Sequence, residues 1–141
     1  MPHRLNLMVI DDNVADLELV REACAEHTDW VNQVITMTSG PEALRHLRSH
    51  DQPIPDLVLT DLSMPAMTGL DVIRTMKSDP RLQLIPVVVL STSSRAEDIQ
   101  DAYMLHASSY MVKSPDFSGF MRQFRSFLDF WKDAKLGHRP R

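Results

Sequence analysis

The chain has 141 residues, 43% of them hydrophobic and 24% charged, which is typical of one soluble globular domain with a sizeable core. Its net charge of -4 provides no basic surface for a nucleic-acid partner. No apolar run reaches the length of a membrane span or of a signal-peptide core, and the single cysteine, Cys24, excludes an internal disulfide. We therefore expect a cytoplasmic protein with neither a nucleic-acid nor a membrane partner.

Short apolar runs alternate with stretches of helical character along the chain. The apolar runs predict buried strands at residues 5–10, 31–38, 57–60, 86–90 and 109–112. The run at 31–38 is less apolar than the others, so we expect it at an edge of the sheet. A helix is predicted after each strand, and the five helices should end near residues 27, 49, 78, 105 and 134.

Polar residues that can cap a helix mark the predicted helix starts. Two Ser-x-x-Glu capping boxes are predicted, the first formed by Ser39 and Glu42 and the second by Ser94 and Glu97. The remaining predicted caps are Asn13, Thr68, and either Ser114 or Asp116. Asp16 falls in the first turn of the first helix, where the helix dipole favours a carboxylate.

Strand and helix alternate five times, which predicts an α/β fold with a doubly wound parallel sheet. Parallel strands need crossover helices, and these helices cover both faces of the sheet. We expect one domain over residues 1–141, with its core at about residues 4–134 and no output domain. Residues 135–141 form a predicted tail that is frayed from Gly137 onward.

Polar side chains follow four of the predicted strands. Asp11 and Asp12 follow the first strand, Asp61 the third, Ser91 the fourth and Lys113 the fifth. Ligands bind at the carboxyl edge of open α/β sheets, where these side chains should converge. Two carboxylates about 4 Å apart repel by roughly 4 kcal/mol at an effective dielectric constant near 20, so three of them need a cation. Oxygen ligands of this kind favour Mg²⁺.

A hydroxyl at Ser91 and an ammonium at Lys113 suit a phosphoryl group beside that metal, because one donates a hydrogen bond and the other supplies a counter-charge. The site therefore predicts phosphoryl transfer to a carboxylate. Each residue also has an ordinary interpretation: Asp12 could cap a helix, Ser91 could belong to a turn, and Lys113 could be a solvated strand end. The agreement of the strand ends favours the functional interpretation.

The motifs together resemble the receiver domain of two-component response regulators, over nearly the whole chain. They are Asp11-Asp12-Asn13, then Asp61-x-x-Met64-Pro65-x-Met67-x-Gly69, then Pro86 to Ser91, then Tyr110-x-x-Lys113. More narrowly, residues 85–99 and 127–131 are similar to stand-alone regulators that partner cyanobacterial and bacterial phytochromes. The resemblance implies a flavodoxin-like receiver with strand order 2-1-3-4-5.

The resemblance implies that Asp61 accepts a phosphoryl group from a sensor histidine kinase, for which a phytochrome is a candidate, or from a phosphotransfer protein. It also implies that Asp11, Asp12 and Asp61 hold Mg²⁺ and that the Ser63 backbone carbonyl completes the protein ligands. Such a protein is an interaction switch rather than a metabolic enzyme. Its only reactions are self-catalysed phosphoryl transfer and autodephosphorylation.

Three further residues have roles implied by the resemblance. Ser91 is the switch hydroxyl, Tyr110 the switch aromatic residue, and Lys113 contacts the phosphoryl oxygens. The chain departs from the family pattern immediately afterwards, because Ser114 stands where receivers usually have proline after a cis peptide bond. A cis bond to a residue other than proline costs about 3 to 4 kcal/mol, so the isomer of this bond is open. Residues 105–108 lack the usual glycine, so His106 would have to tolerate a positive φ.

The last predicted helix bears an apolar stripe at helical spacing. The stripe comprises Phe117, Phe120, Met121, Phe124, Phe127, Leu128 and Trp131. Phe130 falls beside this stripe and widens the apolar surface beyond what one sheet face needs. We therefore predict a homodimer or a kinase contact through the last helix, at Phe127, Phe130 and Trp131.

Two alternatives remain. The first is a degenerate receiver that acts as an adaptor without phosphorylation, which the serine after Lys113 keeps open. The second is an aspartyl-phosphate phosphatase of the dehalogenase-like class, which also uses a strand-end aspartate and Mg²⁺. That class resembles Asp-x-Asp at the nucleophile, whereas Ser63 occupies the second position here, which argues against it.

Overall fold

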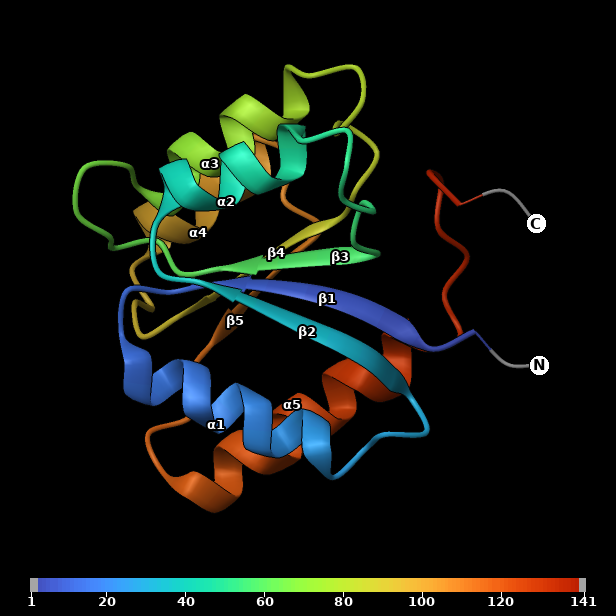
Figure 1. Cartoon of the computed structure of the whole chain (residues 1–141). Coiled ribbons are helices and arrows are strands. Elements are labelled where there is room, and N and C mark those ends of the chain that lie inside the picture. The colour runs from blue at the N-terminus through green and yellow to red at the C-terminus, as the bar shows by residue number, and fades with distance from the viewer. Residues whose placement is uncertain (1–2, 140–141) are drawn as a thin grey trace.

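The computed structural model describes residues 3–139 and contains a five-stranded sheet in the order β2-β1-β3-β4-β5 (Figure 1). All neighbouring strands pair in parallel. The strands are β1 (Leu5–Ile10), β2 (Val31–Met37), β3 (Leu57–Thr60), β4 (Val87–Ser91) and β5 (Ser109–Val112). The predicted fold class and strand order are confirmed, including the edge position of β2.

Five helices connect the strands and cover the sheet on both sides. They are α1 (Val14–Ala25), α2 (Gly40–Arg48), α3 (Gly69–Lys77), α4 (Ala96–Met104) and α5 (Phe117–Trp131). Helices α2, α3 and α4 lie against one face, and α1 and α5 lie against the other (Figure 1). Within residues 3–139, the structure has no helix with both the length and the apolar character needed to cross a membrane.

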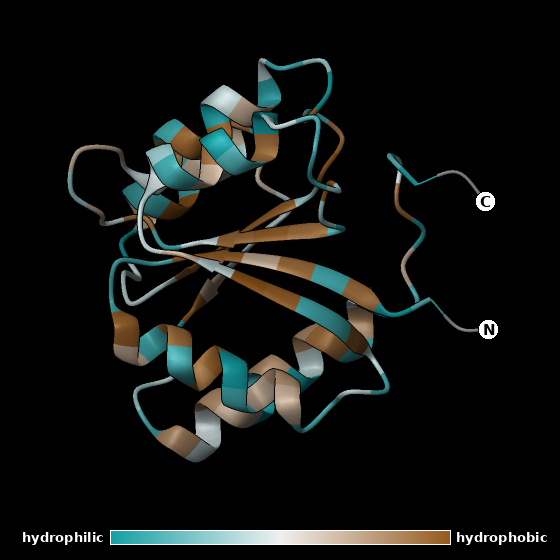
Figure 2. Ribbon diagram, viewed as in Figure 1, coloured by the Kyte–Doolittle hydropathy of each residue, from teal (hydrophilic) through white to brown (hydrophobic). Residues whose placement is uncertain are grey.

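Alternate residues of the central strands enter two separate cores, as the period of a strand requires. In β1, Leu7 and Val9 pack in the core under α1 and α5, whereas Met8 and Ile10 pack in the core under α2, α3 and α4. The strands β3 and β4 divide in the same way and are continuously apolar in Figure 2 except near their ends. A run buried on both faces is typical of parallel sheets with helices on each side.

The strand register brings the carboxyl ends together. Ile10 pairs with Thr60, and Ser91 pairs with Val112. The backbone ladder continues one residue further, since Asp61 N–H donates to the Ile10 carbonyl at 3.0 Å and Lys113 N–H donates to the Ser91 carbonyl at 2.8 Å. The polar residues that follow β1, β3 and β5 therefore emerge at the same edge.

Most predicted caps are confirmed. Asn13, Ser39, Thr68 and Asp116 each cap a helix through the side chain. The first predicted capping box closes differently, because the Glu42 carboxylate accepts from the Thr38 N–H instead of the Ser39 N–H.

The second predicted capping box is wrong. Helix α4 begins after Arg95, which makes no side-chain cap hydrogen bond. The Ser93 hydroxyl takes the place of Ser94: it accepts from the Arg95 N–H at 3.3 Å and donates to Asp98 at 2.6 Å. The Ser93 hydroxyl thus competes with the predicted Ser94 cap, through contacts with groups two and five residues away in the chain.

Helix α5 packs through most of the predicted stripe, with one exception. Phe120, Phe124, Phe127 and Leu128 are buried, whereas Phe117 is 56% exposed. Phe117 is the first residue of α5 and lines an open groove at the carboxyl edge, so no strand covers it. Because Phe127 is only 5% exposed, it belongs to the core and is wrong as a residue of a dimer surface.

The predicted frayed tail is also wrong for residues 137–139, while residues 140–141 lie outside the described part. The His138 ring contacts the Pro55 carbonyl at 3.0 Å, and the Arg139 guanidinium donates to the Ile54 carbonyl at 3.1 Å and pairs with Asp56. The tail therefore folds back onto the loop that precedes β3. Tertiary hydrogen bonds of this kind have no signature in local composition.

The two departures from the family pattern are accommodated locally. His106 has a φ of 73°, as the missing glycine requires. The peptide bond between Lys113 and Ser114 is trans.

Candidate functional site

Three carboxylates meet at the carboxyl edge of the sheet. Asp11 and Asp12 directly follow β1, and Asp61 directly follows β3. One oxygen from each lies within 4.8 Å of the others. Asp11 is buried, Asp61 is half-buried and Asp12 is exposed, so the group opens toward solvent on one side. The predicted convergence of these side chains is confirmed, and their role as metal ligands stays a prediction.

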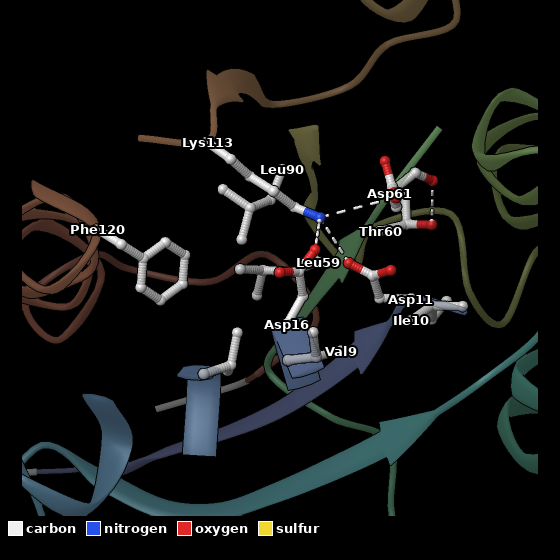
Figure 3. Close-up of a pocket in the computed structure, with 11 residues that line it drawn as sticks. Val9, Ile10, Asp11, Asp16, Leu59, Thr60, Asp61, Leu90, Lys113 and Phe120 are labelled. Atoms are coloured by element: carbon white, nitrogen blue, oxygen red, sulfur yellow. Dashed lines mark hydrogen bonds and ion pairs between the residues drawn. The ribbon is translucent and has the colours of Figure 1, made fainter. Parts of the chain in front are cut away.

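Lys113 reaches into this group from the end of β5. Its Nζ donates to Asp11 at 2.7 Å and to Asp16 at 2.8 Å, and it lies 3.7 Å from Asp61 (Figure 3). The Lys113 side chain is only 7% exposed. Burial by itself would lower the pKa of Lys113, but the hydrogen bonds to Asp11 and Asp16 outweigh it and hold the pKa above its ordinary value. The ammonium is therefore charged at neutral pH.

The carboxylates nevertheless outnumber the ammonium. Burial raises the pKa of Asp11 above its ordinary value, although the hydrogen bonds from Lys113 and from the Asn13 N–H act in the opposite direction. Asp61 adds a further increase through charge repulsion. A site with excess carboxylate charge and oxygen donors fits a hard divalent cation.

The loop after β3 holds Asp61 closely against α3. Gly69 N–H donates to the Leu62 carbonyl at 2.9 Å, and any side chain at Gly69 would collide with the Asp61 backbone carbonyl. The Asp61 carboxylate also accepts from the Leu62 N–H at 2.7 Å. Ser63 lies in the same loop and is exposed, and its backbone carbonyl remains a predicted metal ligand.

The two predicted switch residues are connected through Ser93. The Ser91 hydroxyl is buried at the end of β4 and accepts from the Ser93 N–H at 3.2 Å. The half-buried Tyr110 donates its hydroxyl to the Ser93 carbonyl at 2.9 Å. Ser93 also donates to Asp98 of α4, so hydrogen bonds through Ser93 connect Ser91, Tyr110 and α4.

Asp16 belongs to the site although the sequence analysis assigned it only to the helix dipole. It lies in the first turn of α1, which begins at the same edge of the sheet. Side chains of a helix lean toward its N-terminus, so a first-turn carboxylate can reach back to a strand end. The position of Asp16 one turn after Asp12 was the signal that could have identified it.

Comparison with known proteins agrees with the geometry. The profile of the response regulator receiver domain matches residues 7–124. The chain is 32% identical over 128 residues to the probable methanogenesis regulatory protein FilR2 of Methanothrix harundinacea, covering 89% of this chain and 82% of that protein. It is 31% identical over 132 residues to the response regulator Rcp1 of Synechocystis sp., covering 91% of this chain and 89% of Rcp1.

Solved structures agree with this relationship. The structure of the phosphorylated cyanobacterial phytochrome response regulator RcpA superposes with a TM-score of 0.89 at 37% identity, covering 96% of this chain and 99% of RcpA. The Mn²⁺-bound form of Rcp1 gives a TM-score of 0.84 at 30% identity, covering 93% of this chain and 98% of Rcp1. This chain therefore belongs to the response regulator receiver domain family and is related to Rcp1 and RcpA.

Proposed function

We propose that this chain is a stand-alone, cytoplasmic response regulator that accepts a phosphoryl group on Asp61 and then alters a protein-interaction surface. The observation that supports this best is the buried Lys113 ammonium, which lies 3.7 Å from Asp61 among carboxylates that also surround a potential metal position. The donor is a sensor histidine kinase or a phosphotransfer protein. The relationship to RcpA makes a phytochrome a candidate kinase.

The residues of the site divide the work of the transfer. An Asp61 oxygen attacks the phosphorus of the donor's phosphohistidine, and a P–O bond forms as the P–N bond breaks. The donor histidine takes up a proton as it leaves, and Lys113 neutralises charge on the phosphoryl oxygens. Asp11, Asp12, Asp61 and the Ser63 carbonyl would hold Mg²⁺, which would supply further charge neutralisation. We propose that the reactions of this chain are this transfer and the later hydrolysis of its own adduct.

The switch follows from the link through Ser93. A phosphoryl group on Asp61 offers new acceptor oxygens to the Ser91 hydroxyl, which accepts from the Ser93 N–H in this structure. If Ser91 turns toward these oxygens, the loop that anchors the Tyr110 hydroxyl shifts with it. A nearly complete conversion between two states requires about 5.5 kcal/mol of differential stabilisation, most of which a few charge-assisted hydrogen bonds can supply.

The test is the intact mass of the protein after incubation with acetyl phosphate, with and without Mg²⁺. We expect a labile single-phosphate adduct that requires both Mg²⁺ and Asp61, and that is absent in Asp61→Asn. The matched control is Asp51→Asn, which makes the same change at an exposed residue in the loop before β3. No adduct in a folded wild-type protein would refute phosphoryl acceptance and favour the adaptor alternative.

The interaction surface includes α5. Phe130 is 66% exposed and packs edge-on against Trp131, with ring centroids 5.2 Å apart. We propose that Phe130 and Trp131 form a homodimer or kinase contact. Phe130→Glu should abolish association in sedimentation velocity at micromolar concentration, whereas Ser126→Glu, also exposed on α5, should not. Two results together would contradict this proposal: the wild type is monomeric, and the wild type and Phe130→Glu bind the kinase with the same affinity.

A further inference from the structure

Asp16 binds Lys113 without belonging to the group of possible metal ligands. Its Oδ2 lies 2.8 Å from Nζ, which is 0.9 Å shorter than the 3.7 Å between Nζ and Asp61. The carboxylates that could share a metal ion are Asp11, Asp12 and Asp61. Asp16 therefore engages the lysine from outside that group, and its contribution can be separated from metal binding.

The Lys113 ammonium donates hydrogen bonds to two carboxylates. A lysine has three N–H donors, and Asp11 and Asp16 accept from it at hydrogen-bonding distance. Asp16 and Asp61 approach Nζ from different directions in Figure 3. Any displacement of the ammonium toward Asp61 must therefore lengthen or redirect the bond to Asp16.

We propose that Asp16 competes with the phosphoryl group on Asp61 for Lys113 and so weakens phosphoryl binding. This inference rests on the proposed function. The Asp16–Lys113 ion pair stabilises the form without a phosphoryl group, in which Nζ is turned toward α1. In addition, the negative charge of Asp16 repels the phosphoryl oxygens, and the partly buried site screens this repulsion less than water would. Asp16 is a positioning residue, because it acts through Lys113.

The test measures the affinity of the protein for beryllium trifluoride, which imitates a phosphoryl group on a carboxylate, by calorimetry at saturating Mg²⁺. Asp16→Asn removes the charge, keeps the size and leaves the α1 cap intact, because only the backbone N–H of Asp16 takes part in that cap. We expect Asp16→Asn to bind about tenfold more tightly, the equivalent of one charge-assisted hydrogen bond. The acetyl phosphate adduct should also decay more slowly.

Two variants serve as controls. Glu18→Gln removes an exposed carboxylate from the same helix and should leave the affinity unchanged. Asp16→Glu keeps the charge and should stay near the wild-type affinity. If Asp16 only stabilised the fold, its substitution would weaken the binding of beryllium trifluoride. Tighter binding by Asp16→Asn would therefore distinguish the proposed competition from a structural role.

The outcomes separate this inference from the proposed function. If the folded wild type binds no beryllium trifluoride and forms no adduct, both are overturned. If the wild type binds and Asp16→Asn binds equally or more weakly, only the competition is overturned. If Asp16→Glu binds as tightly as Asp16→Asn, the charge is not the cause and the competition is again overturned.

Discussion

Both the carboxyl edge and the amino edge of the sheet bury charged side chains, but these side chains have different surroundings. At the carboxyl edge, the Lys113 ammonium is surrounded by Asp11, Asp16 and Asp61, so negative charge is in excess. At the amino edge, the fully buried Asp56 has three partners among residues 3–139. The buried carboxylate at the amino edge is paired with the Arg139 guanidinium, whereas the carboxylates at the other edge outnumber the Lys113 ammonium.

Asp56 joins both ends of the chain to the sheet. Its carboxylate accepts from the Asn6 N–H at 2.8 Å, contacts the His3 ring at 3.0 Å and pairs with the Arg139 guanidinium. A carboxylate needs such partners to remain charged while it is buried. A paired buried charge of this kind indicates a structural role, and an excess of like charges in an open site indicates binding.

The largest effect on stability should come from removing the Lys113 ammonium at the carboxyl edge. In the absence of Mg²⁺, Lys113→Met leaves partly buried carboxylates without a counter-charge and should lower the unfolding free energy by about 3 kcal/mol. Saturating Mg²⁺ should recover most of this loss, because the metal replaces the missing positive charge. Urea denaturation with and without Mg²⁺ measures both values. A loss that Mg²⁺ does not reduce would show that the carboxylates are not in excess.

A direct comparison of the two edges uses one substitution at each. Asp56→Asn breaks a completed network and should cost about 2 kcal/mol of unfolding free energy, since Arg139 and the Asn6 N–H lose a charged acceptor. Asp61→Asn, without Mg²⁺, removes one of several repelling carboxylates and should leave the stability unchanged or higher. Equal losses in urea denaturation would contradict the difference between the edges.

The smallest effect concerns pH and the tail. Burial lowers the pKa of His138 below its ordinary value of 6.5, and the nearby Arg139 charge acts in the same direction. The folded state therefore favours the neutral ring. The contribution of the His138 ring to the stability of the folded state is present above pH 6.5. This contribution is lost as the pH falls through the lowered pKa of His138 in the folded state. NMR relaxation of residues 136–139 should show faster motion at pH 5 than at pH 7.5.

A His138→Gln variant provides the control for this last prediction. Glutamine keeps a donor for the Pro55 carbonyl and does not titrate. Its tail should move equally at both pH values. If the tail of the variant loosens on acidification as the wild type does, another group is responsible.

Much of the site could be predicted because strand ends are readable in the sequence. Apolar runs that stop at Asp11, Asp61 and Lys113 identify three strand ends, and the parallel topology then places them together. Asp16 was not predicted as a site residue, because its contact with Lys113 joins residues 97 positions apart in the chain. The Arg139–Asp56 ion pair was not predicted for the same reason.

The sequence by itself determined the alternating order of strands and helices, most of the helix caps and the polar side chains that follow the strands. Hydrophobic period, caps and strand ends are local properties, and they act within a few residues. Only the tertiary structure decided that Phe117 is exposed, that Asp16 binds Lys113 and that the tail is anchored. These outcomes depend on which distant groups compete for the same hydrogen bond or cover the same side chain, and this is fixed only when the chain has folded.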